Sequence, residues 1–170
     1  MTATTNQSVL RTQRRPGWVE GATVGLTAAI AGTLALIVMG SIGGRGGAVL
    51  DAVGMGPGPS GVRALTGASP AVSYLVSHAA LYVVAGIVAL ALARVADRLP
   101  ILLTGLLLVI ILIELGYLVV MTGGEATGRF DNLTWQAVLV AHVVANTVLL
   151  IGILWVHPSL RSAFRRAYEE

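Results

Sequence analysis

Four apolar runs constrain this chain more than any other feature of its sequence. They cover residues 21–42, 72–93, 101–121 and 135–156. A helix needs roughly 20 apolar residues to cross a bilayer core about 30 Å thick, because in lipid each backbone polar group must be paired within the protein. The chain is 55% hydrophobic and 11% charged, a balance far from that of a soluble domain. We therefore expect an all-α integral membrane protein with four transmembrane helices in an up-down bundle.

The arginines predict how the bundle is oriented. One side of the predicted membrane carries Arg11, Arg14, Arg15, Arg94, Arg98, Arg161, Arg165 and Arg166. The other side carries Arg45, Arg63 and Arg129. Because cytoplasmic segments are enriched in arginine and lysine, both termini are predicted to be cytoplasmic in a multi-pass protein of the cell membrane. Since these cations flank apolar runs, we interpret them as topology signals and lipid headgroup contacts, and we expect no nucleic-acid partner.

The extramembrane segments differ in composition. The chain divides into a disordered tail 1–16, a four-span bundle 17–157 and a basic interfacial tail 158–170. The longest connection, residues 43–70, is rich in Gly and Pro and is predicted to be an irregular outer loop. Short helical turns are expected in it near Ala48–Val53 and Gly61–Leu65.

Small residues form one stripe on the first apolar run. The stripe consists of Gly21, Gly25, Ala28, Gly32 and Ala35. Small residues at helical spacing allow a second backbone to approach closely. This stripe predicts either packing within the bundle or contact with another subunit, in a homo-oligomer or a larger membrane complex. One sequence leaves both alternatives open.

Ionisable residues interrupt three of the apolar runs. Glu114 lies seven residues before Met121, while His78 and His142 lie six and seven residues into their own runs. At about 1.5 Å per residue, all three are roughly 9 to 11 Å below the outer interface. A charged carboxylate inside a bilayer costs about 2.5 to 3.5 kcal/mol unless it is paired, protonated or solvated. We therefore expect Glu114 to face the two imidazoles.

Each ionisable residue has polar companions on its own helix face. The sets are Tyr74, His78 and Tyr82; Glu114 and Tyr117; and His142 and Asn146. Spacings of three and four align side chains on one side of a helix. The predicted site is therefore a polar cluster in the outer half of an otherwise apolar bundle.

Two imidazoles at one depth suggest a cofactor site. His78 and His142 are candidate axial ligands of haem b, with Tyr74, Tyr82 and Tyr117 lining the cofactor. Alternatively, His78, Glu114, His142 and Asn146 are candidate ligands of a single copper, zinc or iron ion. Glu114 is then either the third ligand or the acceptor that fixes a histidine tautomer.

Other function classes fit the same residues. The His–Glu network could serve helix pairing in an accessory or structural subunit of a larger membrane complex. It could also relay protons in a transport component, although the inner half offers few polar groups to continue a path. The chain has no cysteine, which excludes thiolate chemistry and cysteine metal ligands. No catalytic motif is present, so catalytic residues are not assigned.

Overall fold

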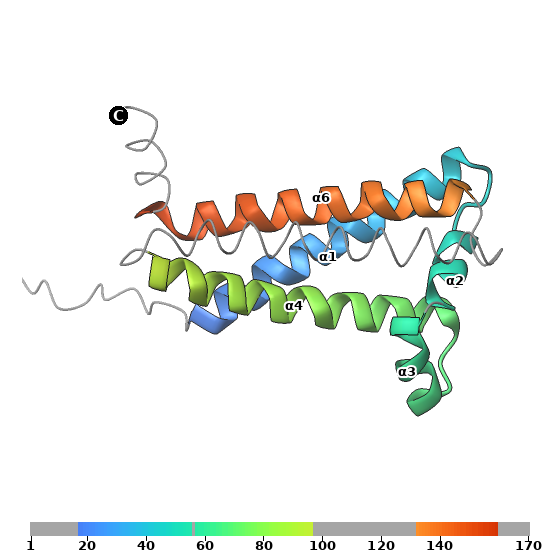
Figure 1. The fold of residues 1–170 in the computed structure, drawn as a ribbon, viewed down its shortest axis with the longest axis horizontal. Coiled ribbons are helices and arrows are strands. Elements are labelled where there is room, and N and C mark those ends of the chain that lie inside the picture. The colour runs from blue at the N-terminus through green and yellow to red at the C-terminus, as the bar shows by residue number, and fades with distance from the viewer. Residues whose placement is uncertain (1–16, 56, 97–131, 160–170) are drawn as a thin grey trace, which may run out of the picture.

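The computed structural model describes residues 17–55, 57–96 and 132–159. All regular structure in these residues is helical. The helices are α1 (Gly17–Ile42), α2 (Ala48–Gly54), α3 (Pro57–Thr66), α4 (Pro70–Ala96) and α6 (Asn132–Val156). Figure 1 shows α1, α4 and α6 as three long rods, with the short α2 and α3 gathered at one end. We call this end the α2 end of the bundle.

The three long helices, α1, α4 and α6, are each long and apolar enough to cross a membrane. The spans are Gly17–Ile42, Pro70–Val95 and Gln136–Val156, and each is apolar over an 18-residue window. They match three of the four predicted transmembrane helices as candidate spans and are compatible with a multi-pass membrane protein. The fourth prediction, residues 101–121, lies outside the described residues, as do the tails 1–16 and 160–170.

Helix α1 exposes large apolar side chains and buries mainly small residues. On α1 the exposed side chains include Leu26, Ile30, Leu34 and Val38, which recur every four residues. The buried residues of α1 are mainly glycine and alanine. In water such a surface would be unfavourable, whereas lipid is as apolar as leucine. The exposed stripe of α1 is therefore suited to contact with lipid.

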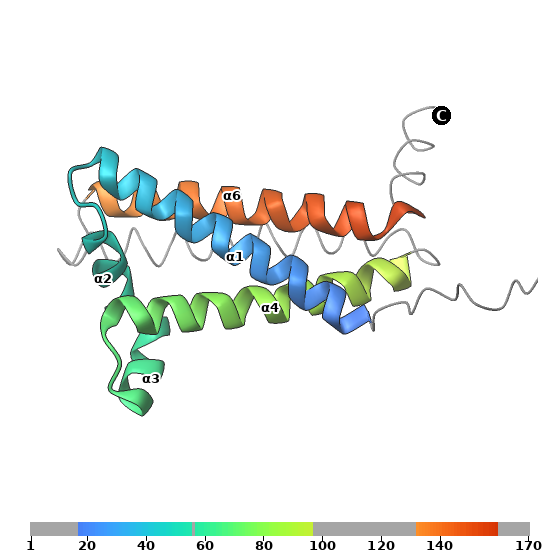
Figure 2. The same cartoon turned by 180° about the vertical axis from the view of Figure 1, so that it is seen from behind.

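Helix α1 runs diagonally across one face of α4 and α6 and contacts both (Figures 1 and 2). Near its start, Gly25 lies against the backbone of Tyr82 on α4, and a Cβ at Gly21 would lie 2.7 Å from the Ile87 Cα. Further along, a Cβ at Gly32 would lie 2.8 Å from the Ala145 Cβ on α6. The small-residue stripe is therefore covered by helices of the same chain. Of the two alternatives for the stripe, the structure supports packing within the bundle.

The connection between α1 and α4 is more regular than an irregular loop. The helical turns predicted near residues 48–53 and 61–65 are present as α2 and α3, and α3 begins earlier, at Pro57. Helix α2 buries Val49 and Val53 against the bundle. The Asp51 carboxylate accepts a hydrogen bond from the Ala71 amide at 3.1 Å, which ties α2 to the first turn of α4. Figure 2 shows α2 and α3 from behind, still beside the start of α4.

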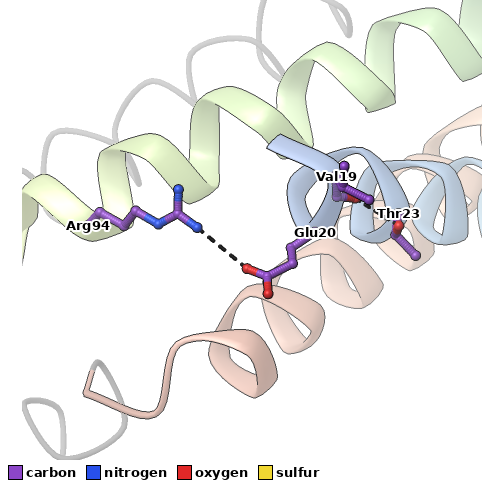
Figure 3. Close-up of polar contacts among 4 residues, drawn as sticks. All are labelled: Val19, Glu20, Thr23 and Arg94. Carbon is purple, nitrogen blue, oxygen red and sulfur yellow. Dashed lines mark hydrogen bonds and ion pairs between the residues drawn. The ribbon is translucent and has the colours of Figure 1, made fainter. Parts of the chain in front are cut away.

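A single ion pair joins α1 and α4 at the opposite end among the described residues. The Arg94 guanidinium lies 3.4 Å from the Glu20 carboxylate (Figure 3). Trp18 and Trp155 are both exposed near this end, at the start of α1 and the end of α6. Aromatic residues of this kind are typical of a membrane–water interface.

Candidate functional site

A ladder of three aromatic rings runs along α4 toward the α2 end. The Tyr74 and His78 rings stack with centroids 5.0 Å apart, and the His78 and Tyr82 rings are tilted with centroids 4.8 Å apart. These rings meet because residues four apart lie one turn above each other on a helix. All three side chains are buried in the bundle. The ladder therefore holds the His78 imidazole between two tyrosines.

Helix α6 brings a second imidazole to this ladder. The ring centroids of His78 and His142 are 6.2 Å apart and the rings are inclined at 50°. One turn further, the Tyr82 hydroxyl donates a hydrogen bond to the Asn146 Oδ1 at 3.3 Å. The sequence predicted that His78 and His142 share a depth, and the structure places them in contact. We call Tyr74, His78, Tyr82, His142 and Asn146 the histidine site.

Helix α1 closes one side of the histidine site with a glycine. A Cβ at Gly32 would lie 3.3 Å from the His78 Nε2 and 3.1 Å from the Ala141 carbonyl oxygen. The Ala29 backbone also lies beside the His78 imidazole. A larger residue at position 32 would push α1 away from α6. The glycine therefore sets how closely α1 covers His78.

Three buried polar atoms of α4 have no hydrogen-bond partner within the part of the chain that the structure describes. They are Ser73 Oγ, Tyr74 OH and His78 Nε2. Buried polar groups are nearly always hydrogen-bonded, and each exception needs an explanation such as water, an ion or a ligand. By contrast, the Ser77 hydroxyl is satisfied by the Ser73 and Tyr74 carbonyl oxygens, at 2.7 and 3.1 Å.

Sequence reasoning missed Ser73 as a member of this group. Serine in a transmembrane helix commonly bonds to its own backbone, so the residue type alone gives little signal. Its position directly before Tyr74 and five residues before His78 was the available clue. Ser73 is completely buried.

Two of the predicted site residues, Glu114 and Tyr117, lie outside the described residues. Among the residues that are described, no group of three or more His, Cys, Asp or Glu side chains could hold a metal ion. What the described helices offer is a pair of imidazoles, the amide oxygen of Asn146 and nearby hydroxyls. A complete ligand set therefore needs a further group.

The separation of the two imidazole ring centroids is compatible with one metal ion bound between the rings. With metal–nitrogen distances of about 2.0 to 2.1 Å, two imidazoles on one metal place their ring centroids roughly 5 to 6.5 Å apart. The observed 6.2 Å lies in this range.

The third histidine, His157, lies beyond the end of α6, where its Nδ1 is 2.6 Å from the Ser159 hydroxyl.

The fold and the site together define a class: a polytopic, helical membrane protein with a buried imidazole, His78, facing the partly buried imidazole of His142. Comparison with family models, curated proteins and solved structures gives no match to this chain. What the protein does must therefore be argued from its own residues.

Proposed function

We propose that this protein binds a transition-metal cofactor between α4 and α6, with His78 and His142 as ligands. The observation that carries the proposal is a pair of imidazoles on two different candidate membrane-spanning helices, with ring centroids 6.2 Å apart. The buried His78 Nε2 supports it, because this atom has no hydrogen-bond partner among the described residues and a buried nitrogen left without one destabilises the fold by about 1 to 3 kcal/mol. A ligand bond would remove this penalty.

The surroundings of His78 suit a ligand. Tyr74 and Tyr82 lie against the imidazole on either side along α4, which limits its rotation. Neutral imidazole is a common ligand of copper, zinc and iron. Asn146 and Glu114 are the proposed oxygen donors, with Glu114 acting either as a third ligand or as the acceptor that orients an imidazole.

A single copper, zinc or iron ion fits the described side of the site better than haem b. Gly32 brings α1 within contact of Ala145 and Ala141 at the depth of His78. This close approach leaves little space on the α1 side for a porphyrin, whereas one ion requires only the gap between two rings. Haem with bis-histidine ligation remains the second form of the same proposal.

The test is elemental analysis by mass spectrometry on protein purified in mild detergent and offered Cu⁺, Zn²⁺, Fe²⁺ or haemin. We compare the wild type with His78→Phe, His142→Phe and the control His157→Phe, because phenylalanine keeps a ring but removes the ligating nitrogen. Near-stoichiometric metal is expected in the wild type and the control, with loss in both site variants. A Soret band would identify haem. A metal-free wild type, or full retention in both site variants that elute as folded protein, would refute the proposal.

A structural role is the second candidate, and one contact favours it. The Tyr82–Asn146 hydrogen bond joins α4 directly to α6, as expected for polar side chains that pair transmembrane helices. In this alternative the protein is an accessory subunit and the histidine site only fixes helix positions. The same variants separate the two functions. A structural site predicts lower thermal stability in His78→Phe and His142→Phe with no metal in the wild type.

A further inference from the structure

Helix α3 extends away from the bundle beside the start of α4. Both views show it projecting sideways from the α2 end, across the direction in which the long helices run (Figures 1 and 2). A helix that lies across the transmembrane direction at the end of a bundle is placed in the headgroup layer. The connection between α1 and α4 therefore presents a helix to the membrane surface.

Helix α3 has defined ends but a weak intrinsic tendency to be helical. It begins at Pro57, a favoured first residue, and ends before Gly67, which has φ of 66° and donates from its amide to the Arg63 carbonyl oxygen at 2.9 Å. It is only 10 residues long and contains Gly58 and Gly61. A helix of this length is marginal in water, so packing must stabilise it.

Packing within the chain covers only part of α3. Helices α2 and α4 contact it, and Val62 and Arg63 are half-buried. Leu65 is 89% exposed, the largest fraction among the large apolar side chains that the structure describes, and Met55, just before α3, is 66% exposed. Because residues two apart lie on nearly opposite sides of a helix, Leu65 and Arg63 give α3 an apolar and a polar side.

Exposed apolar side chains are also present at the start of α4, the membrane-spanning helix that α3 contacts. Near the start of α4, Val72 and Val76 are about half exposed, at 47% and 51%. These residues belong to a membrane-spanning helix and are expected to face lipid. We propose that α3 is an interfacial helix that inserts Leu65 into the headgroup–acyl boundary of the leaflet at the α2 end, together with Met55 from the turn between α2 and α3.

The absence of cysteine allows a direct test by site-specific labelling. We place single cysteines at Leu65, at Met55 and, as the matched control, at Thr66, which is exposed but 100° away around α3. Each variant is labelled with an NBD fluorophore and reconstituted in phosphatidylcholine vesicles. Quenching is measured with lipids brominated near the headgroup end of the acyl chain and, separately, with aqueous iodide. Since the substituted side chains are exposed, the variants should fold normally.

The probes at residues 65 and 55 are expected to be quenched about threefold more by the brominated lipid than the probe at residue 66, with the reverse order for iodide. A probe at Val76 provides the positive control for burial in lipid. The proposal is overturned if the residue 65 probe is open to iodide and insensitive to brominated lipid. It is also overturned if probes at residues 65 and 66 respond equally, because α3 would then have no membrane-facing side.

Discussion

Two regions of the bundle hold their helices together by different means. Near the start of α1, Gly21, Gly25 and Gly86 let the backbones of α1 and α4 touch; we call them the glycine seam. Closer to the α2 end, the histidine site packs aromatic rings and polar side chains between α4 and α6. Without a hydrophobic drive between helices in lipid, close backbone packing and polar contacts are the two available sources of stability.

The difference indicates which region is under a constraint beyond folding. The glycine seam carries no side chain that needs a partner. At the histidine site, the Tyr74 OH and the His78 Nε2 are buried without a partner in the described part of the chain, as is the Oγ of the adjacent Ser73. Helix pairing alone would be served as well by alanine and glycine. The unpaired polar atoms are compatible with the proposed ligand at the histidine site, whereas the seam needs only close packing.

The largest expected effect comes from Gly25→Leu in the glycine seam. A Cβ at this position would overlap the carbonyl of Tyr82, and a backbone group cannot move aside as a flexible side chain can. Overpacking of this kind should destabilise the fold by about 3 kcal/mol, the upper end of the usual range, because the obstacle is backbone. The measurement is recovery of monodisperse protein after heating in detergent. Gly47→Ala, where a Cβ meets nothing within 4 Å, is the control. Normal stability of Gly25→Leu would show that α1 and α4 do not pack as described.

The next effect concerns the attachment of α2 over the histidine site. Asp51→Ala removes the acceptor of the Ala71 amide, a loss comparable to that of a helix cap at about 1 kcal/mol. Hydrogen exchange of the first turn of α4 should accelerate about fivefold, while exchange in the glycine seam stays unchanged. Asp51→Asn, which keeps an acceptor oxygen, should restore slow exchange. Equal acceleration in both regions would mean that the two do not open independently.

A smaller effect tests the polar contacts within the histidine site. Tyr82→Phe removes the hydrogen bond to Asn146 and should cost about 0.6 kcal/mol, the average for such bonds between membrane helices. Tyr74→Phe is the matched comparison, since the Tyr74 hydroxyl is buried without a partner in the described residues. Its removal should leave the stability of the metal-free protein unchanged or raise it. Thermal unfolding in detergent measures both. A loss in Tyr74→Phe equal to that in Tyr82→Phe would place a bound group at the Tyr74 hydroxyl.

Much of this arrangement could be predicted from the sequence because lipid imposes simple rules. Apolar length predicted three of the long helices that the structure contains, and counting residues by depth placed His78 and His142 at one level, where the structure brings their rings together. Helix rotation was not predictable, because a nearly uniform apolar helix gives no strong preference for one face. Contacts of the 43–70 connection were also missed, since the Asp51–Ala71 bond depends on how α2 folds back onto α4. The place of Glu114 stays a prediction.

The smallest effect is expected at the ion pair between Glu20 and Arg94, at the end of the bundle far from α2. The Arg94 Nη2 and Glu20 Oε2 atoms are 3.4 Å apart. The Arg94 side chain is 48% exposed and the Glu20 side chain is 32% exposed. Exposed pairs of this kind typically contribute about 0 to 1 kcal/mol, and salt screens them. Glu20→Gln should therefore lower the stability in detergent only slightly at low salt and not at all in about 1 M salt. A larger, salt-independent loss would indicate that the contact of α1 with α4 depends on this charge as well as on the glycine seam.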